Sequence, residues 1–350
     1  MSPARRDSET EEPDRVAGYP HPRATYDLIG QDAALTRAAR AIRSGRPPQA
    51  WLIAGPPGIG KATLAYRIAR YVLRYGATAN GPDDLAVPPA DPVARQIEAQ
   101  SHPGLLVLRR QENERGKLKT VLDVAEVRRL GGFFGMTAEA GGWRVAIIDS
   151  ADEMNDNAAN ALLKMLEEPP GKAMLLLLSN TPGRLLPTIR SRCQRLEMRP
   201  LDEATLDKLL ARELPETRAA ERAALARVAG GSIGAALTLA SGDGAALAQE
   251  ADRLIDQARE PDVLALLSLG EKLFRTRDGL EQFGEFLSQS LSDRIRAKAQ
   301  AGGGGLDRWV ALHGRIAQNF GRAASLNLEP RQVVLSTARD FSRTARGGGL

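Results

Sequence analysis

Cysteine is almost absent from this sequence: among 350 residues there is one, Cys193. A single thiol excludes an internal disulfide and a multi-cysteine zinc site, and it fits a reducing compartment. Long apolar runs are also missing, since stretches such as AMLLLLS are far shorter than the roughly 20 residues that cross a bilayer. We therefore expect a cytoplasmic protein with no membrane partner.

A strong excess of one charge is lacking as well. The formal net charge is +5 and the pI is near 9.5, and the excess is spread along the chain. Such a balance permits contact with nucleic acid without requiring it. The segment 1–24 mixes both charge signs and has no apolar run of the length that a secretory signal needs, so we interpret it as a disordered tail.

The segment 25–199 alternates apolar runs of strand length with segments of helical period. The runs are continuously apolar, which is typical of strands covered on both faces, as in a parallel sheet with crossover helices. This pattern predicts an α/β domain of the nucleotide-binding type. The expected strands are QAWLIAG, GLLVLRR, WRVAIIDSA, AMLLLLSN and CQRLEM, and the expected helices include Lys61 to Tyr75, VAEVRRLGGFF and NAANALLKMLEE.

After Pro200 the strand signal stops and the remaining segments have helical spacing. The stretches SGDG and GGGG read as breaks between helices. We predict a small helical domain over 200–245 and a larger helical domain over 246–345. One helix face in the second of these is marked by the spacing of Phe283, Phe286, Leu287 and Leu291.

A nearly complete phosphate-binding loop, GPPGIGKAT, follows the first strand and opens the next helix. In such loops the glycines (here Gly55, Gly58 and Gly60) let backbone N–H groups turn toward phosphate oxygens, and the helix N-terminus adds its positive end. Lys61 is placed to reach the terminal phosphates. The strand–loop–helix context makes this a strong prediction of a phosphate site.

Two departures at this site concern hydrolysis. The residue after the lysine is Ala62, whose methyl group cannot replace the hydroxyl that ligates Mg²⁺, and Thr63 is rotated by about 100° around the helix. The strand VAIID supplies Asp149 for the metal's water shell, but the next residue is Ser150, where many ATPases have a glutamate. For the acidic pair that follows, Asp152 and Glu153, we expect capping or partner contacts.

The order and spacing of several motifs resemble the AAA+ subunits of bacterial DNA polymerase III clamp loaders. The similarity covers roughly 25–240 and rests on LIGQ, GPPGIGK, the strand that ends at Asp149, NALLKMLEEPP, LSN and TIRSRC. It implies an AAA+ P-loop domain with a parallel sheet over 25–199, a helical lid over 200–245 and an all-helical collar, for oligomerisation, over 246–345.

The resemblance also implies roles for single residues. Asn180 matches the sensor position that reads the γ-phosphate in active relatives, and Arg192, within Ser-Arg-Cys, matches an arginine that projects into the ATP site of a neighbouring subunit. In the lid, GSIGAAL has Gly234 where active relatives have a nucleotide-contacting arginine. The predicted nucleotide site is thus degenerate, and it comprises Gly55, Gly58, Gly60, Lys61, Ala62, Thr63, Asp149 and Asn180.

No metal site is predicted. Many relatives have a four-cysteine zinc module after the P-loop helix, but the corresponding stretch here contains no cysteine, and His102 alone cannot hold structural zinc. We interpret His102 as a turn residue and Cys193 as a packing residue. No cofactor is required, and the sequence leaves open whether ATP or ADP binds weakly or structurally.

The leading hypothesis is a clamp-loader subunit that does not hydrolyse ATP itself and donates Arg192 to a neighbouring ATPase during loading of the sliding clamp. Its implied partners are the gamma/tau ATPase subunits, the delta subunit, the sliding clamp and, through the complex, primer-template DNA. One alternative is an active ATPase of the gamma/tau type, against which Ala62, Ser150 and Gly234 speak. Another is an unrelated AAA+ adaptor or DNA-repair ATPase.

Overall fold

The computed structural model describes residues 16, 18–111, 119, 121–135, 142–240, 244–275, 279–326 and 328–346. These residues form two compact units by their internal contacts. The first unit comprises Met1–Leu209 with Gly231–Ala235, and the second comprises Leu210–Gly230 with Ala236–Leu350. The predicted lid range 200–245 contributes residues to both units, and its boundaries stay a prediction.

The first unit is built on a five-stranded parallel sheet with the order β2-β3-β4-β1-β5. Strand β1 lies between β4 and β5, and Trp51 pairs with Leu176 on one side and with Gln194 on the other. Each predicted strand is present. The strands are β1 (Ala50–Ala54), β2 (Leu105–Leu108), β3 (Arg144–Ile148), β4 (Ala173–Ser179) and β5 (Gln194–Glu197).

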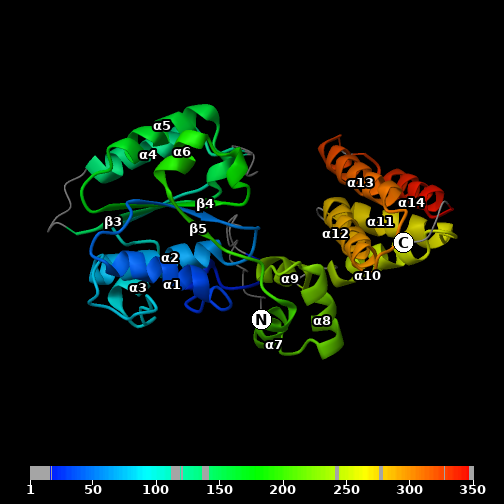
Figure 1. The fold of residues 1–350 in the computed structure, drawn as a ribbon, viewed down its shortest axis with the longest axis horizontal. Helices are drawn as coiled ribbons and strands as arrows, with labels where there is room; N and C mark the ends of the chain where they lie inside the picture. Colours follow the sequence, from blue (N-terminus) through cyan, green and yellow to red (C-terminus); the bar gives the residue numbers. More distant parts are fainter. Residues whose placement is uncertain are drawn as a thin grey trace, which may run out of the picture. The chain divides into compact units, whose positions relative to one another are not determined.

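Helices cover both faces of this sheet, as Figure 1 shows, with α1, α2 and α3 on one face and α4, α5 and α6 on the other. Alternate residues of β1 serve the two cores, since Trp51 and Ile53 pack with the first set and Leu52 packs with the second. The helices are α1 (Asp32–Arg43), α2 (Lys61–Tyr75), α3 (Pro92–Glu98), α4 (Val124–Gly135), α5 (Asp156–Glu167) and α6 (Pro187–Arg192).

Helix α2 has the predicted bounds and is the structural centre of its layer. It anchors the chain that precedes the domain: Arg70, whose side chain is buried, donates to the carbonyls of Arg23 and Thr25 and stacks on the ring of Tyr26. A short 3₁₀ helix, Pro22–Ala24, lies in this held segment. Arg70 thus holds the residues around the predicted tail boundary at residue 24, and the boundary itself stays a prediction. Residues 1–15 and 17 of the tail lie outside the described residues.

The remaining described chain is helical, as predicted. In the second unit α8 lies against α10 and α12, and α11 and α13 each pack with α14. Phe283, Leu287 and Leu291 are fully buried in its core with Phe286 at the edge, which confirms the predicted face. The helices are α7 (Glu203–Glu213), α8 (Ala219–Val228), α9 (Ile233–Ala240), α10 (Gly244–Asp256), α11 (Val263–Arg275), α12 (Gly279–Gln300), α13 (Asp307–Leu326) and α14 (Pro330–Arg346).

None of the helices in the described ranges has the length and apolar character that crossing a membrane requires.

Candidate functional site

The predicted phosphate loop lies at the carboxyl edge of the sheet, between the end of β1 and the start of α2. Gly58 and Gly60 adopt positive φ angles of 71° and 100°, which glycine allows at no steric cost. The loop leads directly into the first turn of α2, and together they give the backbone the form of a phosphate cradle. Asn180 follows β4 and Asp149 follows β3, and both lie at the same edge.

Lys61 is fully engaged by the protein. Its ammonium group donates to the carbonyls of Gly55 (2.8 Å) and Pro56 (2.6 Å) and to Oδ1 of Asn180 (2.6 Å). An ammonium has three protons, so these three acceptors account for its whole donor capacity. The side chain is 8% exposed. A phosphate oxygen could reach Lys61 only by displacing one of these partners.

Burial lowers the pKa of Lys61 to about 8, against the opposing effect of the carboxylates of Asp149 and Asp152. Asp152 also accepts the backbone N–H groups of Asn180 (3.0 Å) and Thr181 (3.2 Å). This is the capping contact expected for Asp152. It fixes the turn after β4 and with it the side chain that faces Lys61.

Glu153, the second residue of the acidic pair, forms an ion pair with Arg110 at 2.8 Å. Ser150, in the place of the ATPase glutamate, has a φ of 53° and precedes the turn Ala151–Glu153. The structure thus uses both members of the acidic pair in local contacts.

The segment Gly231–Ala235 closes over the loop within the same unit. Ser232 donates through Oγ to the carbonyl of Pro57 (2.9 Å), and the N–H of Gly234 donates to the carbonyl of Gly58 (2.9 Å). A Cβ atom at Gly234 would lie 2.8 Å from Cα of Gly58, and a Cβ at Gly58 would lie 2.4 Å from Oγ of Ser232. The two backbones approach so closely that neither position accommodates a side chain.

In this arrangement the residues lack three contacts that a magnesium–ATP site uses. Ala62 has no oxygen for the metal, Lys61 has no proton left for a phosphate, and Gly234 has no room for an arginine in this arrangement. Three or more His, Cys, Asp or Glu side chains do not gather into a possible metal site anywhere in the described ranges.

Arg192 lies at the opposite edge of the sheet. It is the last residue of α6, two positions before β5, and lines a pocket of about 380 Å³ together with Ala50, the first residue of β1. The four residue steps of β1 separate this pocket from the P-loop by about 13 Å. The structure therefore does not bring Arg192 to the chain's own predicted nucleotide site.

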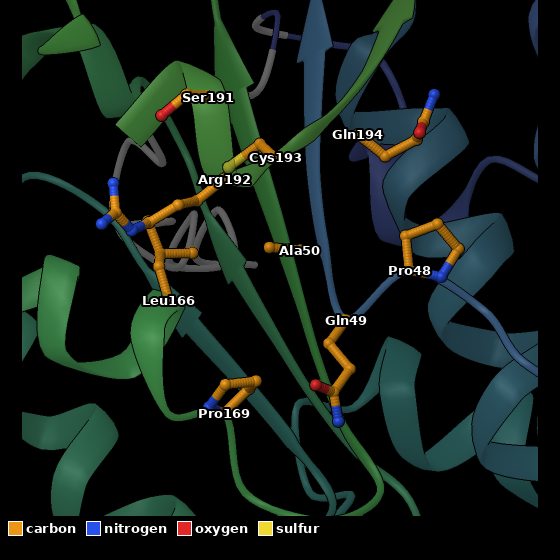
Figure 2. A pocket seen from close by; sticks show the side chains of 9 residues that line it. All are labelled: Pro48, Gln49, Ala50, Leu166, Pro169, Ser191, Arg192, Cys193 and Gln194. Carbon is orange, nitrogen blue, oxygen red and sulfur yellow. The ribbon is translucent and has the colours of Figure 1, made fainter. Parts of the chain in front are cut away.

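The Arg192 pocket, as we name it, is polar and carries one charged side chain among its nine lining residues. Figure 2 shows Arg192 and Leu166 on one side and Gln49 and Pro48 on the other. Cys193 also lines it, and burial raises the pKa of this thiol to about 12, so that it stays protonated. This agrees with a packing role for Cys193.

Arg192 is 37% exposed. Its guanidinium donates from Nη1 to the carbonyl of Thr188 (3.0 Å), and its Nη2 forms an ion pair with Oε1 of Glu167 (2.9 Å). Glu167 is a contact that the sequence reasoning missed, although the residue lies within the quoted NALLKMLEEPP stretch.

His102 occupies a turn before β2, where its Nδ1 accepts the N–H of Gly104 at 3.0 Å. Burial lowers its pKa, so the neutral form that accepts this hydrogen bond is favoured. This arrangement agrees with its interpretation as a turn residue. The predicted absence of zinc remains a prediction.

Together, the parallel sheet, the P-loop at the carboxyl end of β1 and the helical remainder define the AAA+ type of P-loop protein. Residues 30–202 match the protein family described as DNA polymerase III, delta subunit. Over about half of its length the chain is similar to proteins of the DNA polymerase III clamp loader, among them delta prime subunits.

Two of these relatives are called DNA polymerase III subunit delta′. The Pseudomonas aeruginosa protein is 41% identical over 184 residues, which cover 52% of this chain and 53% of that one. The Escherichia coli protein is 36% identical over 203 residues and 58% of each chain. The tau subunit of Salmonella typhimurium is 28% identical over 94% of this chain and 49% of its own. The chain thus spans about half the length of the curated relatives it matches.

Proposed function

We propose that this chain is a clamp-loader subunit of the DNA polymerase III holoenzyme that does not hydrolyse ATP and donates Arg192 to the ATP site of a neighbouring ATPase subunit. One observation carries the proposal: the cation of the chain's own loop, Lys61, is saturated by protein acceptors, while Arg192 is exposed at the far edge of the sheet.

The loss of the chain's own turnover follows from its residues. Metal ligation, water activation and the lid contact each depend on a side chain that this sequence replaces, by Ala62, Ser150 and Gly234 respectively. The closed contacts of the loop add a physical reason, since a nucleotide would have to break hydrogen bonds within the protein before it could be held. No cofactor is required in this proposal, and bound ATP or ADP would be weak or structural.

Arg192 has the chemistry that the donated role needs. A guanidinium has five N–H donors in a planar fork, of which the hydrogen bond to Thr188 uses one, and Glu167 forms an ion pair at the other terminal nitrogen. The remaining donors can contact an anion supplied by another molecule. An arginine placed in trans on the γ-phosphate stabilises the charge of the transition state and is worth about 10³- to 10⁵-fold in rate.

The partners in this proposal are the gamma/tau ATPase subunits beside Arg192, the delta subunit and the sliding clamp. Primer-template DNA is reached through the complex. The helices after residue 245 would serve as the collar that assembles the subunits.

A second function, that of an active gamma/tau-type ATPase, is favoured by the similarity to tau over 94% of this chain. Hydrolysis of ATP by the isolated chain separates the two functions, because the proposed subunit is inert alone and a gamma/tau-type subunit is not.

The test is reconstitution of the clamp loader with its ATPase subunits, followed by DNA-stimulated ATP hydrolysis with wild-type chain, Arg192→Ala and Arg190→Ala. Arg190 is an exposed arginine of the same short helix and serves as the matched control. We expect Arg192→Ala to remove the turnover of the adjacent site by about 10³-fold while assembly is retained. Equal turnover of the two variants would contradict the donated arginine, and turnover by the isolated chain would favour the second function.

A further inference from the structure

The Arg192 side chain is held from two different elements. Thr188, one turn earlier on α6, accepts from Nη1 through its carbonyl, and Glu167, the last residue of α5, forms an ion pair with Nη2 through Oε1. Helices α5 and α6 pack against each other beside the sheet. A hydrogen bond at one terminal nitrogen and an ion pair at the other hold the plane of the guanidinium, which either contact alone would leave free to rotate.

The ion pair between Arg192 and Glu167 is poorly suited to stabilising the fold. The side chains are 37% and 50% exposed, and a pair in that position gains little in water. A long arginine side chain, however, loses considerable rotamer freedom whenever it is fixed. Fixing it before a partner arrives removes that cost from the step in which the arginine is used.

We propose that Glu167 is the positioning residue of Arg192. It holds the guanidinium in the plane set by α5 and α6, so that the remaining N–H donors are presented in one orientation to an anion of the neighbouring subunit. The inference rests on the proposed function of Arg192 and adds the residue that orients it. Glu167 does not touch the nucleotide and acts through Arg192 alone.

Two substitutions of Glu167 separate its role as an acceptor from its role as a charge. If the carboxylate matters as an acceptor in the right place, Glu167→Gln retains most of its role, because the amide oxygen can still accept from Nη2. Glu167→Ala removes the acceptor. We therefore expect the alanine variant to lose about 5- to 10-fold in kcat of the assembled complex, and the glutamine variant no more than about 2-fold, with KM unchanged in both.

The matched control is Glu168→Ala. Glu168 is the adjacent exposed glutamate, and removing it alters the charge of the same surface without touching the guanidinium contact. The decisive measurement is the double variant Glu167→Ala/Arg192→Ala in the reconstituted clamp loader. Because Glu167 acts only through Arg192, the double variant should match Arg192→Ala alone.

Each outcome decides one point. If Arg192→Ala lowers turnover and Glu167→Ala does not, the positioning role fails and the donated arginine stands. If Glu167→Ala lowers turnover equally with and without Arg192, Glu167 is a structural residue and the inference is overturned. If Arg192→Ala has no effect, the proposed function itself has failed.

A readout independent of turnover uses the arginine side-chain NMR signals of the full chain. In the wild type we expect separate signals for the terminal N–H groups of Arg192, because the two contacts slow rotation of the guanidinium. In Glu167→Ala these signals should merge, and in Glu168→Ala they should not. Merged signals in the wild type would overturn the proposal even if the alanine variant failed to assemble.

Discussion

Each end of the parallel strands carries a cationic side chain, but Lys61 at the carboxyl end is buried whereas Arg192 at the amino end is exposed. At the carboxyl edge, Lys61 is buried and its three protons are bound by the protein's own oxygens. At the amino edge, Arg192 is exposed, and one hydrogen bond and one ion pair leave part of its five donors available. The comparison teaches that a cation's availability, and not its presence in a motif, decides whether it can act on a phosphate.

We expect the largest effect from a substitution at the amino edge, at Arg192. Replacing Arg192 with lysine keeps the charge but loses the planar fork that Thr188 and Glu167 hold. We expect Arg192→Lys to lower the turnover of the adjacent site by at least about 100-fold, with little change in the stability of the isolated chain. DNA-stimulated ATP hydrolysis and urea unfolding measure the two effects. Retained turnover would mean that charge alone suffices at this position.

A substitution at the carboxyl edge should lower the stability of the chain without changing the ATP turnover of the complex. Gly234→Ala places a methyl group 2.8 Å from Cα of Gly58, so a backbone must shift, and we expect a loss of about 2 kcal/mol in the free energy of unfolding. Gly171→Ala is the control, because a Cβ at Gly171 meets nothing within 4 Å. Urea unfolding of both variants and turnover of the complexes test this. Equal stability of the two variants would show that the segment does not rest on the loop.

The burial of Lys61 can be tested through the pH dependence of the free energy of unfolding. Its folded pKa of about 8 is below the ordinary 10.5, so at pH 7 the buried charge destabilises the folded state in full. As the pH rises from 8 toward 10.5, the folded state loses the proton first and the penalty is relieved. Relative to Lys61→Met, the free energy of unfolding of the wild type should rise by about 1 kcal/mol between pH 7 and pH 9.

The control for this titration is Lys164→Met, which removes an exposed lysine of α5. Its stability relative to the wild type should be flat over the same pH interval. A flat difference for Lys61→Met as well would show that Lys61 is not held as the structure has it.

The smallest effect is expected at Cys193, beside the arginine. Its pKa of about 12 leaves about one thiol in 10⁴ ionised at pH 8, so iodoacetamide should label the folded chain slowly and the urea-unfolded chain quickly. Cys193→Ala should leave turnover of the complex within about 2-fold. Rapid labelling of the folded chain would contradict the neutral, packed thiol.

The sequence was most informative where a signal is local. Helix α2 was predicted residue for residue because a strand, a glycine loop and a helical period follow one another directly. The strands followed from continuous apolar runs. Helix α6, which carries Arg192, was not predicted, because six residues that begin with proline contain no measurable period.

The contacts on which the proposed function depends lie beyond local patterns. Glu167 and Arg192 are separated by 25 positions, and Lys61 and Asn180 by 119, so no spacing rule connects them. The motif reasoning named Lys61, Asn180, Gly234 and Arg192 as special positions. It could not show that the protein's own oxygens accept all three protons of Lys61. That arrangement depends on the position of the turn after β4, which Asp152 holds.

The close approach of Gly58 and Gly234 limits how this loop could be re-engineered. Supplying the missing groups by substitution, at 62, 150 and 234, would place an arginine where 2.8 Å separates the first side-chain carbon from a backbone atom. The change at position 234 requires two segments of main chain to part. A designer would therefore have to remodel the path of Gly231–Ala235 before a larger side chain could be placed at position 234, because the obstacle there is the backbone of the facing loop.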